Sequence, residues 1–114
     1  HEDLTAAQAI EPLQSSDKVA LLLLPNAPWA RRVSGVYSND LTNQHPDRAH
    51  AVLTEKADGH YLVSVRAPLN NRQGAAALCR QFSTGGGREA AAGVNDLPAE
   101  RLEDFIHAFK KAYL

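Results

Sequence analysis

The sequence predicts a single α/β domain: a mixed β-sheet of about four to five strands with helices packed on it and an amphipathic helix at the C-terminus. Three observations support this prediction. Residues 19–24 form a short apolar run, two strand-like segments flank Asp58-Gly59, and apolar residues recur at helical spacing after Pro98. A chain of 114 residues is long enough for one domain with one hydrophobic core.

The chain divides near residue 18. Residues 1–17 are expected to be a linker or a truncated edge; the short apolar patch at 6–13 leaves a weak helix as the alternative. Residues 18–114 are expected to be the folded domain, because strand and helix patterns follow one another from there to the end.

The first elements of this domain are a strand and a helix. Residues 19–24 are too few for a helix and are stopped by Pro25, which predicts a central strand buried on both faces. The mixed pattern at 29–41 allows a helix, which Gly35 would weaken.

A hairpin is predicted next. Residues 51–57 and 60–66 flank Asp58-Gly59, a pair that favours a two-residue type I′ turn between antiparallel strands. The two-residue period of the second strand gives a core-facing side of Tyr61, Val63 and Val65. The other side carries Leu62, Ser64 and Arg66, so Ser64 and Arg66 are expected to point the same way.

The second half is predicted to contain two helices with a glycine loop between them. One helix follows from spacings of i, i+3, i+4 and i+7 and should end near Ser83; its apolar positions are Ala75, Leu78, Cys79 and Phe82. After the glycines, residues 88–92 are expected to form one helical turn, followed by a strand through Val94. Pro98 suits the first turn of the closing helix, whose apolar stripe is Leu102, Phe105, Ile106, Phe109 and Tyr113.

Charge and composition exclude several classes of protein. A formal net charge of −1 lacks the basic excess that drives non-specific binding to long nucleic acids, so any anion site must be local. No acidic residue lies between Asp58 and Glu89, a stretch with four arginines: Arg66, Arg72, Arg80 and Arg88. The single Cys79 is predicted to be buried, and the sequence shows neither a signal peptide nor a membrane span. We therefore expect a cytoplasmic protein with no membrane partner.

The motif GGGREAAAG, which begins at Gly85, is the main candidate site. Gly85, Gly86 and Gly87 can form a nest of backbone N–H groups for a phosphate or carboxylate, and Arg88 would add a two-pronged charged donor. A dinucleotide fingerprint is rejected because it requires a preceding strand, and a P-loop would need Lys after its last glycine. The alternative that the glycines only allow a flexible turn or tight packing stays open.

Other polar residues lack the spacing that catalysis or metal binding requires. His45 and His50 are expected in a polar loop with Asp47 but match no metal motif. Ser64 and Ser83 have no histidine that the sequence places beside them. We predict no catalytic residue and no metal ligand in this chain.

Three features in order resemble the DHH-associated C-terminal domain of the DHH phosphoesterases: Ser64-Val65-Arg66, the helix ending in Phe82, and GGGREAAAG followed by a strand and a final helix. The resemblance implies a substrate-binding domain in which Gly85, Gly86 and Gly87, together with Ser64 and Arg66, face the phosphates of a nucleotide, short oligonucleotide or single-stranded nucleic acid. It also implies a separate N-terminal DHH domain of the same parent chain, which carries the catalytic metals, typically manganese. No cofactor is expected in this chain.

One position departs from the family pattern. The family usually has histidine where this chain has Arg88. Arginine stays charged at physiological pH, so a role in clamping phosphate can be transferred to it, whereas a role as proton donor or metal-proximal ligand cannot.

The alternatives are a tRNA-binding domain and a non-catalytic interaction domain. The C-terminal domain of alanyl-tRNA synthetases is similar and also places arginine after three glycines, but its loop continues with a Pro-Asp-Met type sequence that Glu89-Ala-Ala does not match. The favoured prediction is a fragment of a metal-dependent phosphoesterase that does not hydrolyse substrate by itself.

Overall fold

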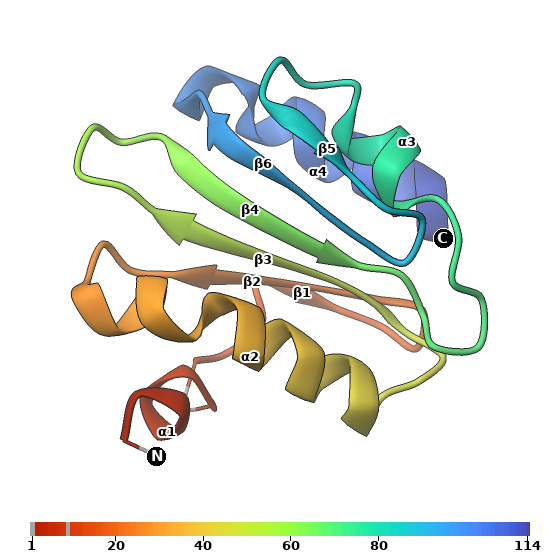
Figure 1. The fold of residues 1–114 in the computed structure, drawn as a ribbon, viewed down its shortest axis with the longest axis horizontal. Coiled ribbons are helices and arrows are strands. Elements are labelled where there is room, and N and C mark those ends of the chain that lie inside the picture. Colours follow the sequence, from red (N-terminus) through yellow and green to blue (C-terminus); the bar gives the residue numbers. More distant parts are fainter. Residues whose placement is uncertain (1, 9) are drawn as a thin grey trace.

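A six-stranded mixed sheet runs through the molecule in the order β1-β2-β3-β4-β6-β5 (Figure 1). The computed structural model describes residues 2–8 and 10–114, the side chains of residues 2–4 excepted. The strands are β1 (Gln14–Ser15), β2 (Val19–Leu24), β3 (Ala49–Glu55), β4 (Tyr61–Arg66), β5 (Gly85–Gly87) and β6 (Ala91–Leu97). β2 and β3 are parallel, and the other neighbouring strands are antiparallel. The predicted fold class is confirmed, with more strands than expected.

Helices cover both faces of this sheet. They are α1 (Glu2–Gln8), α2 (Pro28–Gln44), α3 (Ala75–Cys79) and α4 (Leu102–Tyr113), with a 3₁₀ turn at Ala99–Arg101. Helix α2 is the crossover between the parallel strands β2 and β3, and it packs with α1 on one face, while α3 and α4 pack on the other (Figure 1). Among the described residues, no helix is long and apolar enough to cross a membrane.

Strand β2 confirms the predicted burial on both faces. Val19 and Leu21 join the core beneath α3 and α4, whereas Ala20, Leu22 and Leu24 join the core beneath α2. The short β1 is the edge strand of the sheet on this side, and β2 is the next strand. β1 was not expected, because two residues are too few to show a strand pattern.

The predicted hairpin is confirmed, but its turn is of a different type. β3 and β4 pair in antiparallel register, with Ala51 opposite Val65. The N–H of Gly59 donates to the carbonyl of Lys56 at 3.0 Å, and the N–H of Lys56 donates to the carbonyl of His60 at 2.8 Å. Gly59 has a φ of 85°, and no described non-glycine residue has a positive φ, which excludes the type I′ turn. The glycine therefore acts as a bulge residue after a β-turn.

The glycine segment forms an edge strand. Gly85–Gly87 pairs with β6, and a tight turn follows in which the N–H of Arg88 donates to the carbonyl of Ala91 at 2.8 Å. The predicted helical turn at 88–92 is therefore wrong. The alanines favour a helix locally, but β6 bonds to β4 on one side and to β5 on the other, and this pairing overrides the local preference.

The closing helix is confirmed and carries the aromatic part of the core. Phe105, Ile106 and Phe109 are buried, and Leu102 and Tyr113 pack against the same cluster. The ring centroids of Phe82 and Phe105 are 5.6 Å apart, and those of Phe105 and Phe109 are 6.2 Å apart. This core supports the face of β6 opposite to α2.

Candidate functional site

Arg66 is the last residue of β4, and its guanidinium group is held in place by three hydrogen bonds. Nε donates to Oδ1 of Asn39 at 2.9 Å, and Nη1 donates to Oγ of Ser64 at 2.9 Å and to the carbonyl of Val65 at 3.2 Å. Within the described parts of the chain, no carboxylate forms an ion pair with it. The result is a partly buried, oriented positive charge without a counterion, and its Nη2 has no protein acceptor among those residues.

Ser64 and Asn39 orient this guanidinium. Ser64 lies two residues before Arg66 on the same face of β4, as predicted, and its Oγ is 3.2 Å from Oγ of Ser38 in α2. The hydroxyl of Ser38 also donates to the carbonyl of Ser34 at 2.7 Å. Helix α2 and strand β4 therefore share a polar contact at the point where the arginine emerges.

A row of small residues continues from Ser64 across the sheet. Gly93 of β6 lies opposite Ser64, and Gly86 of β5 lies opposite Gly93. Neighbours in register point to the same face of a sheet, so this row lies on the α2 side. Gly86 and Gly93 add no side chain to that face, which leaves the sheet open to close approach beside Arg66.

The three glycines of β5 differ in what surrounds them. A Cβ on Gly85 would lie 1.7 Å from the carbonyl oxygen of Cys79, and a Cβ on Gly87, whose φ is 141°, would lie 2.5 Å from Cα of Ala92. A Cβ on Gly86 would meet no atom of the described chain within 4 Å. Packing within the chain therefore accounts for Gly85 and Gly87 but not for Gly86.

Arg88 follows β5 and contributes a second positive charge. Burial lowers the pKa of Arg66, and the nearby charge of Arg88 lowers it further. Two guanidinium groups that repel each other in this way are stabilised by an anion between or beside them.

A pocket of about 310 Å³ adjoins Arg66. Its lining includes Arg72 from the loop after β4, Ala91 from β6, and Asn39 and Asn43 from α2. Sequence reasoning missed the two asparagines. They lie four residues apart, as do the buried hydroxyl residues Ser38 and Thr42, and this polar stripe was the available signal, although the predicted helix at 29–41 ended before Thr42 and Asn43. Arg80 does not line this pocket; it is exposed at the end of α3, on the other face of the sheet.

The expected polar loop around His45 and His50 is only half correct. His45 is exposed and caps the end of α2, whereas His50 is fully buried in β3. The strand begins at Ala49, and its alternation places His50 on the α2 side of the sheet, opposite Ala20 of β2. The polar residues that precede His50 in the sequence favoured a loop, so its position in a strand was not predicted.

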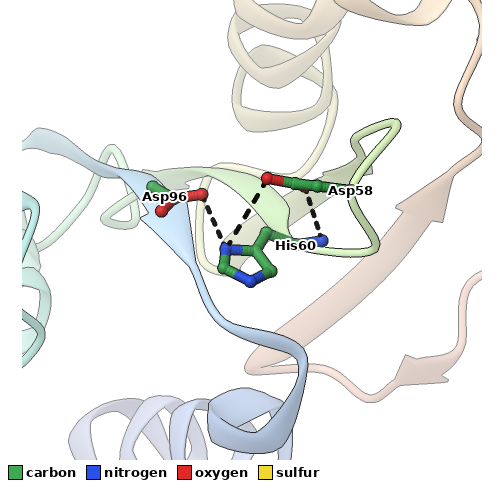
Figure 2. A group of neighbouring side chains, drawn as sticks. All are labelled: Asp58, His60 and Asp96. Atoms are coloured by element: carbon green, nitrogen blue, oxygen red, sulfur yellow. Dashed lines mark hydrogen bonds and ion pairs between the residues drawn. The ribbon is translucent and has the colours of Figure 1, made fainter.

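A separate group of titratable side chains lies at the far end of the hairpin. Figure 2 shows the His60 ring between the carboxylates of Asp58 and Asp96. His60 Nδ1 is 2.9 Å from Oδ1 of Asp96 and 3.9 Å from Oδ2 of Asp58, distances short enough for the three residues to share a cation. However, Nζ of Lys56 already lies 2.8 Å from the same oxygen of Asp96. We interpret the group as an ionic contact that ties the hairpin turn to β6.

This contact predicts a pH-dependent contribution of Asp96 to stability. Hydrogen bonds from Lys56 and His60 lower the pKa of Asp96 in the folded state. Its contribution is therefore present above the usual carboxyl pKa of about 4 and is lost as pH falls through the lower folded value. We expect Asp96→Asn to have a lower Tm than wild type at pH 7, and this difference to vanish in acid.

Thermal unfolding followed by circular dichroism between about pH 7 and pH 2 measures this difference. The exposed Asp17→Asn removes a carboxylate elsewhere and should match wild type throughout. A Tm difference for Asp96→Asn that stays constant down to the lowest pH contradicts the prediction.

The chain matches a protein-family model. The model described as the DHHA1 domain matches residues 16–113 of the chain. No curated protein is significantly similar to the chain in sequence.

Solved structures share the fold. An exopolyphosphatase-related protein from Bacteroides fragilis superposes with a TM-score of 0.59 at 16% identity, over 97% of this chain and 33% of that protein. A pGpG-specific phosphodiesterase from Vibrio cholerae gives a TM-score of 0.60 at 12% identity, over 96% of this chain and 36% of that protein. A DHH domain structure, described as a member of a family of ribosomal proteins, gives a TM-score of 0.58 at 14% identity, over 96% of this chain and 29% of that protein. The chain thus spans about a third of the length of each of these structures.

Proposed function

Because the chain belongs to the DHHA1 domain family, we propose that it is the substrate-binding part of a DHH-family phosphoesterase. Ser64, Arg66, the Gly85–Gly87 strand and Arg88 form the surface that holds phosphate groups in this proposal. The substrate is a nucleotide, a short oligonucleotide or single-stranded nucleic acid. A DHH domain, N-terminal in the same parent chain, closes over this surface and performs the hydrolysis.

The observation that carries the proposal is the state of Arg66. Its guanidinium is fixed by Asn39, Ser64 and Val65, lacks a carboxylate partner among the described residues, and lies close enough to Arg88 for the two charges to repel. A phosphate group supplies the missing negative charge and accepts hydrogen bonds from Nη2. Because the arginine is already oriented, little conformational entropy is lost when the anion binds.

Gly86 supports the same interpretation. It lies on the α2 side of the sheet in register with Gly93 and Ser64, and nothing in the described chain fills the space that a side chain would occupy there. A phosphate ester can approach the backbone of an edge strand closely at such a position.

This surface does not fit a metal ion. Its polar groups are the guanidinium groups of Arg66 and Arg88, the hydroxyl of Ser64 and the amide of Asn39, and none is the carboxylate, imidazole or thiolate that a divalent metal prefers. In this proposal, the DHH domain binds the manganese expected for the family. Arg88 holds phosphate and does not transfer protons, because its charge is permanent.

The proposal predicts that Arg66→Gln weakens phosphate binding at least about tenfold, since a charge-assisted hydrogen bond is lost. Backbone amide shifts during titration with a 5′-phosphorylated oligonucleotide, at millimolar concentration, measure the affinity. The shifts should centre on Arg66, on residues 85–88 and on the neighbouring end of α2.

Two further variants make this test specific. Arg80→Gln removes the same charge on the opposite face and should bind like wild type, whereas Gly86→Ala should weaken binding without lowering Tm. If Arg66→Gln and Arg80→Gln lose affinity equally, general charge attraction explains the binding and the proposal is wrong.

A further inference from the structure

A second cavity, of about 280 Å³, lies on the opposite side of the C-terminal half of α2. Tyr37 and Leu41 of that helix face it, as does the C-cap residue His45, whereas Asn39 and Asn43, on the opposite side of the helix, face the pocket beside Arg66. Its remaining walls come from β2, from the segment after α1, and from Arg48 and His50. The cavity is therefore separate from the proposed phosphate surface.

His50 at the base of this cavity lacks hydrogen-bond partners. The residue is 0% exposed, and within the described part of the chain neither ring nitrogen makes a hydrogen bond. The backbone of Arg48 lies close enough to the ring to favour its protonated form, but the contact does not meet hydrogen-bond geometry. Neutral imidazole carries one donor and one acceptor, and burying both without partners is unfavourable. A ligand group in the cavity can satisfy them.

Arg48 determines the charge that such a ligand should carry. Its Nε is buried and has no hydrogen-bond partner, and among the described residues no carboxylate forms an ion pair with the guanidinium. Of the described residues that line the cavity, only Glu11 is acidic, and it is exposed at the rim. The ring of His45 lies 6.1 Å from that of His50 and adds a further donor. These groups favour an anion that accepts hydrogen bonds.

We propose that the cavity binds a small oxyanion, presented as a carboxylate, phosphate or sulfate group, between Arg48 and His50. The guanidinium donates to one oxygen, and the His50 ring, whose nitrogens are buried before binding, rotates to donate an N–H to another. A volume of about 280 Å³ is several times the roughly 30 Å³ occupied by one water, so the space admits the anion together with a small organic substituent. Leu22 and Leu41 provide apolar contacts for such a substituent. This inference does not depend on the proposed phosphoesterase function.

The surroundings of His50 also predict how binding responds to pH. Burial lowers the pKa of His50 to about 4, and the charges of Arg48 and His45 act in the same direction. Tyr37 and the rim residue Glu11 also face the cavity. Arg66, opposite His50 in β4, directs its guanidinium to Asn39 and Ser64. A bound anion favours the protonated ring, so affinity should rise as pH falls from about 8 to 5.

Titration with inorganic sulfate tests the site, because the charge of sulfate is constant over this pH range. The ring nitrogens of His50 and the Nε–H of Arg48 are followed by NMR at constant ionic strength, with chloride as the balancing anion. We expect saturable shifts with a millimolar Kd, and a Kd at least about tenfold weaker in Arg48→Gln and in His50→Leu. Arg80→Gln, which removes an exposed charge on the other face of the sheet, should keep the wild-type Kd, and His45→Gln should retain the dependence on pH.

The outcomes are distinct. Tighter sulfate binding at pH 5 than at pH 8, lost in Arg48→Gln, supports the site. Absence of saturable shifts at about 100 mM sulfate, or an unchanged Kd in Arg48→Gln, overturns it and assigns the cavity to water. Arg48→Gln changes a partly exposed side chain, so the test remains valid even if His50→Leu alters the fold.

Discussion

Gly85→Ala is expected to destabilise the domain by about 3 kcal/mol, because a side chain there collides with backbone atoms. The added Cβ would lie 1.7 Å from the carbonyl oxygen of Cys79 and 2.5 Å from its carbonyl carbon. Neither atom can rotate away, so β5 must separate from the end of α3 and disturb the core around the buried Cys79. Urea denaturation of the wild type and of Gly85→Ala gives the two free energies of unfolding to compare.

Gly86→Ala is the matched control, one residue further along the same strand. Its Cβ has no neighbour within 4 Å, so we expect a change of no more than about 0.5 kcal/mol. Equal losses in the two variants would show that the strand tolerates no side chain at all, and would contradict the division of the glycines into packed and open positions.

Phe105→Ala is expected to lower the free energy of unfolding by about 4 kcal/mol. Phe105 is fully buried and contacts the rings of Phe82 and Phe109, so truncation removes apolar contacts on two sides and leaves a cavity that α4 cannot close. Binding at Arg66 depends on this core only indirectly, because the core supports the opposite face of β6.

Ile106→Val on the same helix is the comparison for this prediction. It removes one buried methyl group and should cost about 1 kcal/mol. Urea unfolding of both variants gives the two losses in free energy of unfolding, which are then compared. A loss in Phe105→Ala no larger than that in Ile106→Val would mean that the aromatic cluster is not the centre of the core.

The elements that could be predicted from the sequence are those whose own side chains show a pattern of apolar residues. The apolar run of β2 follows from burial on both faces, whereas the alternation in β4 and the stripe of α4 each follow from one buried face, and the structure confirms all three. Alternation in β4 also places Ser64 and Arg66 on one face, a relation that depends only on the two-residue period of a strand.

Elements defined by their partners could not be predicted in this way. β5 consists only of glycine, which has no side-chain pattern, and it forms because β6 offers a free edge. Burial of His50 and the contact between Asn39 and Arg66 depend on where α2 crosses the sheet, which no local signal specifies. The turn at Asp58-Gly59 differs because the carboxylate of Asp58 accepts a hydrogen bond from the N–H of His60 at 3.0 Å, which suits a residue at negative φ.

The shortness of the two outer strands has a consequence for how copies of this domain behave in solution. β1 has two residues and β5 has three, and they form the two edges of the sheet. A long, flat edge can recruit a foreign strand and begin aggregation, whereas edges this short provide too few backbone groups to hold one. The domain can therefore keep a glycine strand free of side chains, as close approach of a ligand requires, without becoming a template for edge-to-edge association.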